Sequence, residues 1–173
     1  MFLVLVVRPY SCYHFFMELL KKNYVKYGLI TCLAIIFCLA TMELTGQNSS
    51  FDNKSPFQFI LMFIYPAVIL YIGILAEKRL LKNKIAYKKA LYEGIKISLV
   101  YALVSPFIIM LYYIFVNHGI IEYVRQAYNL NGQPDIIVVG ADMIAQFFSA
   151  IVFGSFYAAL IALLLRTRTT KKK

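Results

Sequence analysis

The last apolar stretch of this 173-residue sequence holds the residues whose types and spacing come nearest to a chemical site. Asp142 and Gln146 stand one helical turn apart near its beginning. A carboxylate and an amide on one helix face could together bind a proton or a cation. We expect Asp142 at the end of the helix that meets the aqueous interface. A carboxylate is tolerated at that position even if it has no function. If the helix instead begins at Pro134, Asp142 lies deeper and becomes a candidate proton or cation site.

Small residues continue the same helix face at a spacing of four. Such a ridge lets another helix approach closely, which is how helices associate in a bilayer, where burying apolar surface gains little over lipid. We therefore predict a helix-packing seam made of Ala150, Gly154, Ala158 and Ala162.

Two prolines lie deep inside other apolar stretches. Pro66 and Pro106 each leave a backbone carbonyl without its helical partner, so we predict a kink at each. Shape is the structural interpretation, since neighbouring helices satisfy the freed carbonyls. A hinge or a binding site is the functional alternative.

Other reactive side chains are few and scattered. Cys32 and Cys38 fall on different faces of one helix, so with Cys12 they make no disulfide framework, and we expect buried thiols. His14 and His118 have no Cys or His partner at metal-ligand spacing. No catalytic motif occurs in the sequence. We predict no cofactor and no metal site, and a membrane enzyme is the least favoured function.

Four apolar stretches position these residues, at about 24–44, 57–76, 95–116 and 143–165. Each is long enough for a helix to cross a hydrocarbon core of about 30 Å. Strand-type alternation is absent, and 61% hydrophobic with 15% charged residues is too apolar for a soluble domain. Tyr112 and Tyr113 end the third stretch, as interfacial tyrosines do. The predicted fold class is an all-α integral membrane protein of four helices in two transmembrane hairpins.

Basic residues alternate between the segments that join these stretches. Sixteen of the 18 lysines and arginines lie before or at the beginning of the first stretch, between the second and third or at the beginning of the third, or after the fourth. Only Lys54 and Arg125 lie on the other side. The positive-inside rule then places both termini and the linker 78–93 in the cytoplasm. We expect the net charge of +10 to face anionic phospholipids and not nucleic acid.

The amino-terminal residues 1–16 are too short to span and lack the features of a signal peptide. Met17 offers a second start directly before a basic lead-in to the first stretch. We predict that residues 1–16 are a non-native or poorly ordered extension and that residues 17–173 form a single four-span domain. A short interfacial anchor is the alternative.

The second outer loop shows helical periodicity. Ile120, Ile121 and Val124 recur on one face, opposite Glu122 and Arg125. This pattern predicts a short amphipathic helix in the outer headgroup layer. A lid over a site is the functional alternative.

Two stretches carry a resemblance to a known family. Residues 26–30 (KYGLI) and the linker residues 85–95 (IAYKKALYEGI), with a fourth span that closes in a basic tail, resemble the domain-of-unknown-function 4199 family of small bacterial membrane proteins. The resemblance covers about residues 17–173. It implies an integral protein of the bacterial inner membrane with four helices, and it implies no reaction.

The sequence therefore predicts a structural or accessory subunit that packs with a second copy of itself or with another membrane protein. The alternative is a small transporter or channel with a proton or cation site near Asp142 and Gln146.

Overall fold

Apolar stretches of this length fold as helices, because a backbone surrounded by lipid must form its hydrogen bonds within its own segment. The computed structural model describes residues 18–44 and 64–167, and all regular structure within these ranges is helical. The predicted all-α fold class is confirmed for this part of the chain. In chain order, the helices are α2 (Asn23–Leu44), α4 (Tyr65–Leu80), α5 (Tyr87–Phe115), α6 (Gly119–Ala127) and α7 (Asp135–Leu165).

Three of these helices, α2, α5 and α7, are long and apolar enough to cross a membrane, which is typical of a membrane protein. α2 agrees with the first predicted span to within one residue, and α5 covers nearly all of the third. The second predicted span is described only in part. Its residues 57–63 lie outside the described residues, and α4 supplies 16 residues that continue past the predicted end, to Leu80.

The fourth span differs from the prediction at its beginning. We expected it to start near Met143, but α7 already begins at Asp135. Pro134 stands at the N-cap, where a missing N–H costs no helical hydrogen bond, and Asp135 places negative charge at the positive end of the helix dipole. Apolar residues 136–139 then continue the helix. Asp142 therefore lies about two turns inside α7.

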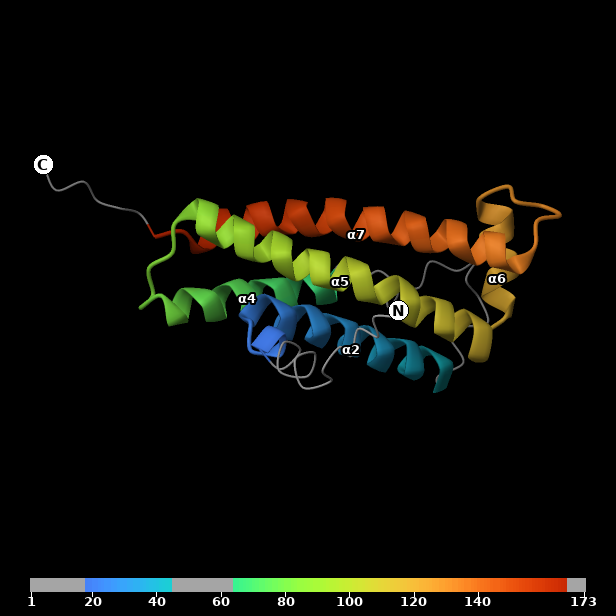
Figure 1. Cartoon of the computed structure of the whole chain (residues 1–173), viewed down its shortest axis with the longest axis horizontal. Coiled ribbons are helices and arrows are strands. Elements are labelled where there is room, and N and C mark those ends of the chain that lie inside the picture. Colours follow the sequence, from blue (N-terminus) through green and yellow to red (C-terminus); the bar gives the residue numbers. More distant parts are fainter. Residues whose placement is uncertain (1–17, 45–63, 168–173) are drawn as a thin grey trace, which may run out of the picture.

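α5 lies at the centre of the bundle, where it contacts α2, α4 and α7 (Figure 1). It runs antiparallel to α7 and parallel to α2. α4 lies beside the beginnings of α2 and α5, and the carbonyl oxygen of Gly73 accepts a hydrogen bond from Asn23 Nδ2 at 3.0 Å. The bundle is thus built around one helix whose sides are covered from three directions.

α5 and α7 approach each other closely at two glycines. A Cβ atom on Gly154 would lie 2.5 Å from the Cβ of Ser98, and a Cβ atom on Gly94 would lie 2.6 Å from the Cβ of Ala158. Both distances are too short for a side chain, so larger residues would force these helices apart. The hydroxyl of Ser98 donates to the carbonyl oxygen of Gly94 at 3.0 Å and is thereby satisfied within its own helix.

Two clusters of buried apolar side chains fill the bundle. One joins α4, α5 and α7 around Ile74 and Ile97. The other joins α5, α6 and α7 around Ile120 and Val138, at the end of the bundle that α6 crosses (Figure 1). The predicted short helix is therefore present as α6. Its apolar face packs on α5 and α7 instead of pointing into a headgroup layer, because the early start of α7 brings Val138 against it.

At the opposite end, the linker before α5 pairs with the chain after α7. The N–H of Thr167 donates to the carbonyl oxygen of Ile85 at 2.9 Å, and the N–H of Ile85 donates to Thr167 Oγ1 at 3.0 Å. Lys82 and Asn83 adopt positive φ angles of 53° and 60°, which turn the linker tightly. These contacts fix the end of α7 to the beginning of α5.

The exterior of the bundle is apolar. Phe37, Phe107 and Phe148 are each more than half exposed, at 70%, 57% and 61%. On α7 this exterior runs from Ile136 to Leu164. Apolar surface on this scale is unusual for a protein in water and is typical of helices that face lipid.

Candidate functional site

Asp142 lies inside the bundle, at the end that α6 covers. Its side chain is 7% exposed, and it lies about 9 Å further along α7 than Ile136, where the apolar exterior begins. This burial differs from the expectation that Asp142 lies at the aqueous interface. α7 begins beside Pro134, so the geometry is the one under which Asp142 becomes a candidate proton or cation site.

Three side chains donate hydrogen bonds to the carboxylate of Asp142. Tyr113 on α5 donates to Oδ2 at 3.0 Å, Gln146 on α7 donates to the same oxygen, and Tyr128 after α6 donates to Oδ1 at 3.3 Å. Within the described ranges, no lysine, arginine or histidine forms an ion pair with Asp142. The carboxylate has polar donors but lacks a counter-cation there, and a buried charge without one is costly.

The sequence predicted Asp142 and Gln146 as a pair, and the structure brings them together. It did not predict the two tyrosines. Tyr113 was expected at the membrane interface, and Tyr128 is the residue that directly follows α6. The signal that could have found Tyr128 is the turn at residues 129–134, because a helix that begins at Pro134 folds back against the segment before the turn.

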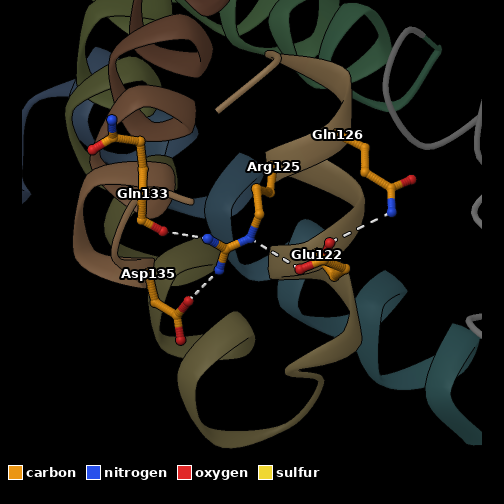
Figure 2. A network of polar contacts seen from close by, with 5 residues as sticks. All are labelled: Glu122, Arg125, Gln126, Gln133 and Asp135. Carbon is orange, nitrogen blue, oxygen red and sulfur yellow. Dashed lines mark hydrogen bonds and ion pairs between the residues drawn. The ribbon is translucent and has the colours of Figure 1, made fainter. Parts of the chain in front are cut away.

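Arg125 fastens α6 to the beginning of α7 (Figure 2). Its guanidinium donates to Glu122 Oε2 on the same helix at 2.9 Å, to Asp135 Oδ1 at 2.5 Å, and to the carbonyl oxygen of Gln133. Gln126 donates to the other oxygen of Glu122 at 3.5 Å. The guanidinium of an arginine presents five donors in a fixed planar fork that suits several separated acceptors, whereas a lysine is a compact point charge. We call this group the Arg125 latch, and it holds α6 over the end of the bundle.

A cavity of about 450 Å³ extends from Asp142 into the middle of the bundle. Its volume is in the range of small-molecule sites. Among the described residues that line it, Asp142 is the one that carries a charge. Apolar side chains form most of the wall, and the polar groups among them include Ser98, Tyr101, Ser105, Tyr113, Gln146 and Ser149.

The small residues of the predicted packing seam lie against helices of the same chain. Gly154 meets Ser98 of α5, while Ala158 and Ala162 are fully buried in the cluster formed with α4 and α5. Ala150 lines the cavity. The ridge that was predicted to pack against a partner helix therefore packs mainly against α5 of the same chain.

The two prolines predicted to kink helices both lie near the cavity. Pro106 stands inside α5, which stays helical on both sides of it, and the preceding Ser105 is 2% exposed and lines the cavity. Pro66 also lines the cavity, in the first turn of α4 as described. Residues 57–63 lie outside the described residues, so a kink at Pro66 is not tested.

Comparison with known sequences adds the family. A sequence model described as "Protein of unknown function (DUF4199)" matches residues 26–167. The chain belongs to this family. The match includes every residue of the Asp142 site and agrees with the resemblance seen in the sequence. No curated protein and no solved structure matches the DUF4199 chain.

The DUF4199 chain has a second buried carboxylate at the opposite end of the bundle. Glu93 is 4% exposed and lies 3.8 Å from Lys96 Nζ. The same ammonium lies 5.1 Å from the ring centre of Tyr24 and 5.2 Å from that of Tyr92. Glu93 thus has a close counter-cation, which sets it apart from Asp142. Sequence analysis did not single out this group.

The remaining candidate reactive residues of the DUF4199 chain form no site within residues 18–44 and 64–167. Cys32 and Cys38 are buried free thiols in α2. No group of three His, Cys, Asp or Glu side chains in these ranges could hold a metal ion. Cys12, His14 and the predicted start at Met17 lie outside the described residues.

Tyr128 lies outside the helices that could cross a membrane. Desolvation, followed by the charge of Asp142 and the hydrogen bond to it, raises the pKa of Tyr128 above its ordinary value. The phenol therefore keeps its proton at neutral pH and continues to donate to the carboxylate.

Proposed function

We propose that the DUF4199 chain is a small transporter or channel that moves a proton or a cation through a site at Asp142. One observation carries this proposal: a 7% exposed carboxylate faces a cavity and has hydrogen-bond donors, but no ion-pair partner, among the described residues. Ionisable groups held inside membrane proteins are rare, and they mark ion pathways and proton relays.

The accessory-subunit hypothesis loses its main support from the sequence. It relied on the ridge of small residues along α7 as a surface for a partner helix. Ala158 and Ala162 are fully buried by α4 and α5, so this ridge is already covered within the chain. A second copy or another membrane protein would have to bind elsewhere.

We also propose that the protein is a multi-pass protein of the bacterial inner membrane with both termini in the cytoplasm. The supporting facts are the positions of the charges along the bundle. Basic residues 78–89 and Arg166 gather at the end where Ile85 pairs with Thr167, whereas Arg125 lies at the α6 end. The positive-inside rule orients the first end toward the cytoplasm, where anionic phospholipids bind basic residues. Asp142 then lies nearer the outer face.

Cysteine labelling tests the orientation. In a background without Cys12, Cys32 and Cys38, a cysteine at Asn131 should react with a membrane-impermeant maleimide in intact cells. A cysteine at Asn83 should react only after the membrane is opened. Labelling of the Asn83 position in intact cells would overturn the topology.

Flux in proteoliposomes tests the function. Proton flux is followed with an enclosed pH-sensitive dye, and potassium or sodium flux with a potential-sensitive dye. Asp142→Asn keeps the shape and removes the charge, so it should abolish the flux. Glu18→Gln is the control, because it likewise neutralises a carboxylate, at an exposed position that lies neither in the cavity wall nor in the Arg125 latch. Equal flux through wild type and a well-folded Asp142→Asn variant would overturn the proposal.

A further inference from the structure

The walls of the cavity point to a chemical class of substrate. We infer that the Asp142 site binds an organic cation with a single positive charge and an apolar body, such as a lipophilic quaternary ammonium or phosphonium ion. This inference rests on the proposed function and specifies the substrate of the same site.

The charge of the site fits one positive charge. Asp142 is the one charged residue among the described lining residues, and a monocation would neutralise it. An anion or a dication would leave an unbalanced charge in an apolar interior, which is strongly unfavourable. Charge complementarity therefore favours a monocation.

The carboxylate has room for a ligand on one of its oxygens. Oδ2 accepts from both Tyr113 and Gln146, whereas Oδ1 accepts from Tyr128 alone, across the longer distance of 3.3 Å. Each carboxylate oxygen offers about two lone-pair positions. A cation can therefore approach Oδ1 on the side of Tyr128 while Tyr113 and Gln146 keep the carboxylate oriented.

The size and polarity of the cavity favour an organic ion over an inorganic one. Small-molecule sites begin at about 300 Å³, and this cavity measures about 450 Å³. Ile35, Leu39 and Ile109 contribute apolar wall, which gives no ligands to a metal ion. Hard inorganic cations need several oxygen ligands at once, while an apolar wall stabilises the body of an organic ion by burial.

Tyrosine rings from three elements surround the space. Tyr101 and Tyr113 come from α5, Tyr123 and Tyr128 from α6 and its C-cap, and Tyr157 from α7. Aromatic faces attract organic cations, by about 0.5–2 kcal/mol for each well-placed ring. A single carboxylate within a set of tyrosines is the chemistry that recognises quaternary ammonium and phosphonium ions.

Equilibrium dialysis of the purified full-length protein in detergent tests this inference with two probes. Tetraphenylphosphonium is an apolar monocation, and tetraphenylborate has the same shape with the opposite charge. We expect the cation to bind and the anion to bind at least about tenfold more weakly. This comparison uses wild-type protein only, so it decides the question even where a variant fails to fold.

Variants then locate the binding site. Asp142→Asn should weaken tetraphenylphosphonium binding at least about tenfold. Tyr101→Leu removes a ring that lines the cavity and should weaken binding about two- to thirtyfold, while Tyr101→Phe keeps the ring and should bind like wild type. Equal affinity for the two probes, or unchanged affinity of a folded Asp142→Asn variant, would overturn the inference.

The two proposals fail in different ways. If proton or inorganic-cation flux depends on Asp142 but tetraphenylphosphonium does not bind, the substrate class is wrong and the proposed function stands. If tetraphenylphosphonium binds in an Asp142-dependent way, but proteoliposomes show no Asp142-dependent flux of tetraphenylphosphonium, protons, potassium or sodium, the site binds organic cations and the transport proposal is wrong.

Discussion

The hydroxyl of Tyr113 on α5 donates a hydrogen bond to Asp142 Oδ2 on α7 across 3.0 Å, and both side chains are less than 10% exposed. This contact joins the two helices of the second predicted hairpin at the depth of the cavity. It also fixes the direction in which the carboxylate points. The loss of stability when this hydrogen bond is removed therefore measures how much the contact stabilises the fold.

Tyr113→Phe should lower the free energy of unfolding by about 1–2 kcal/mol, because it removes one donor to a buried carboxylate and the acceptor of a hydrogen bond from Gln146. Tyr112→Phe is the matched control. Tyr112 is equally buried and donates to Glu43 at 2.8 Å, but Glu43 is exposed and can bond to water instead. Thermal unfolding in detergent should rank the Tyr113 variant below the Tyr112 variant. The reverse order would show that Asp142 does not depend on Tyr113.

Arg125→Ala should loosen α6, because it removes the contacts to Glu122, Gln133 and Asp135 together. Arg125→Lys keeps the charge without the fork and should have an intermediate effect. Partly exposed ion pairs contribute about 1 kcal/mol or less each, and Arg125→Ala removes two of them. Local opening of α6 should therefore become easier, and amide hydrogens of residues 119–134 should exchange with solvent about five- to thirtyfold faster in the alanine variant. Amides of α5 should be unchanged. Uniform acceleration throughout the chain would instead indicate global destabilisation.

Gly154→Ala should destabilise the protein by about 1–3 kcal/mol, because the added Cβ would lie 2.5 Å from Ser98 Cβ. Gly140→Ala is the matched control on the same helix, since no atom of the described residues lies within 4 Å of a Cβ there. That variant should be neutral or stabilised by up to about 1 kcal/mol. Thermal unfolding distinguishes them. Adding Ser98→Gly to Gly154→Ala should restore part of the loss, and a silent Gly154→Ala would remove the close-packing interpretation.

Alkaline pH should weaken the contact between Tyr128 and Asp142. Desolvation, then the neighbouring carboxylate, raises the pKa of Tyr128 in the folded protein above its value of about 10 in an unfolded chain. Its contribution to stability is thus fully present below about pH 10 and is lost as the pH rises through the folded pKa. The difference in unfolding temperature between wild type and Tyr128→Phe should be constant up to about pH 9 and narrow above pH 10. A constant difference at every pH would contradict this.

Hydropathy could predict the helices but not the depth of Asp142. The charge of Asp142 divides an apolar stretch, so an apolar window places the beginning of the helix after it. The helix instead begins at Asp135, because Pro134 and Asp135 favour a helix start at this position. The cost of burying the Asp142 carboxylate is reduced by the three side chains that donate hydrogen bonds to it. Tyr113 could not be predicted as the partner of Asp142, because the two residues are 29 positions apart and belong to different helices. The ridge through Gly154 was visible in the sequence, but only the fold shows that α5 covers it.

The pairing of Thr167 with Ile85 and the Arg125 latch make the two ends of the bundle chemically unequal. Neutral hydrogen bonds join Thr167 to Ile85, whereas charged side chains form the Arg125 latch. Dissolved salt screens exposed charges over about 10 Å at 0.1 M and has little effect on neutral hydrogen bonds. Ionic strength should therefore act directly on the Arg125 latch, so a rise in electrolyte should loosen α6 over Asp142 while the pairing of Thr167 with Ile85 stays intact.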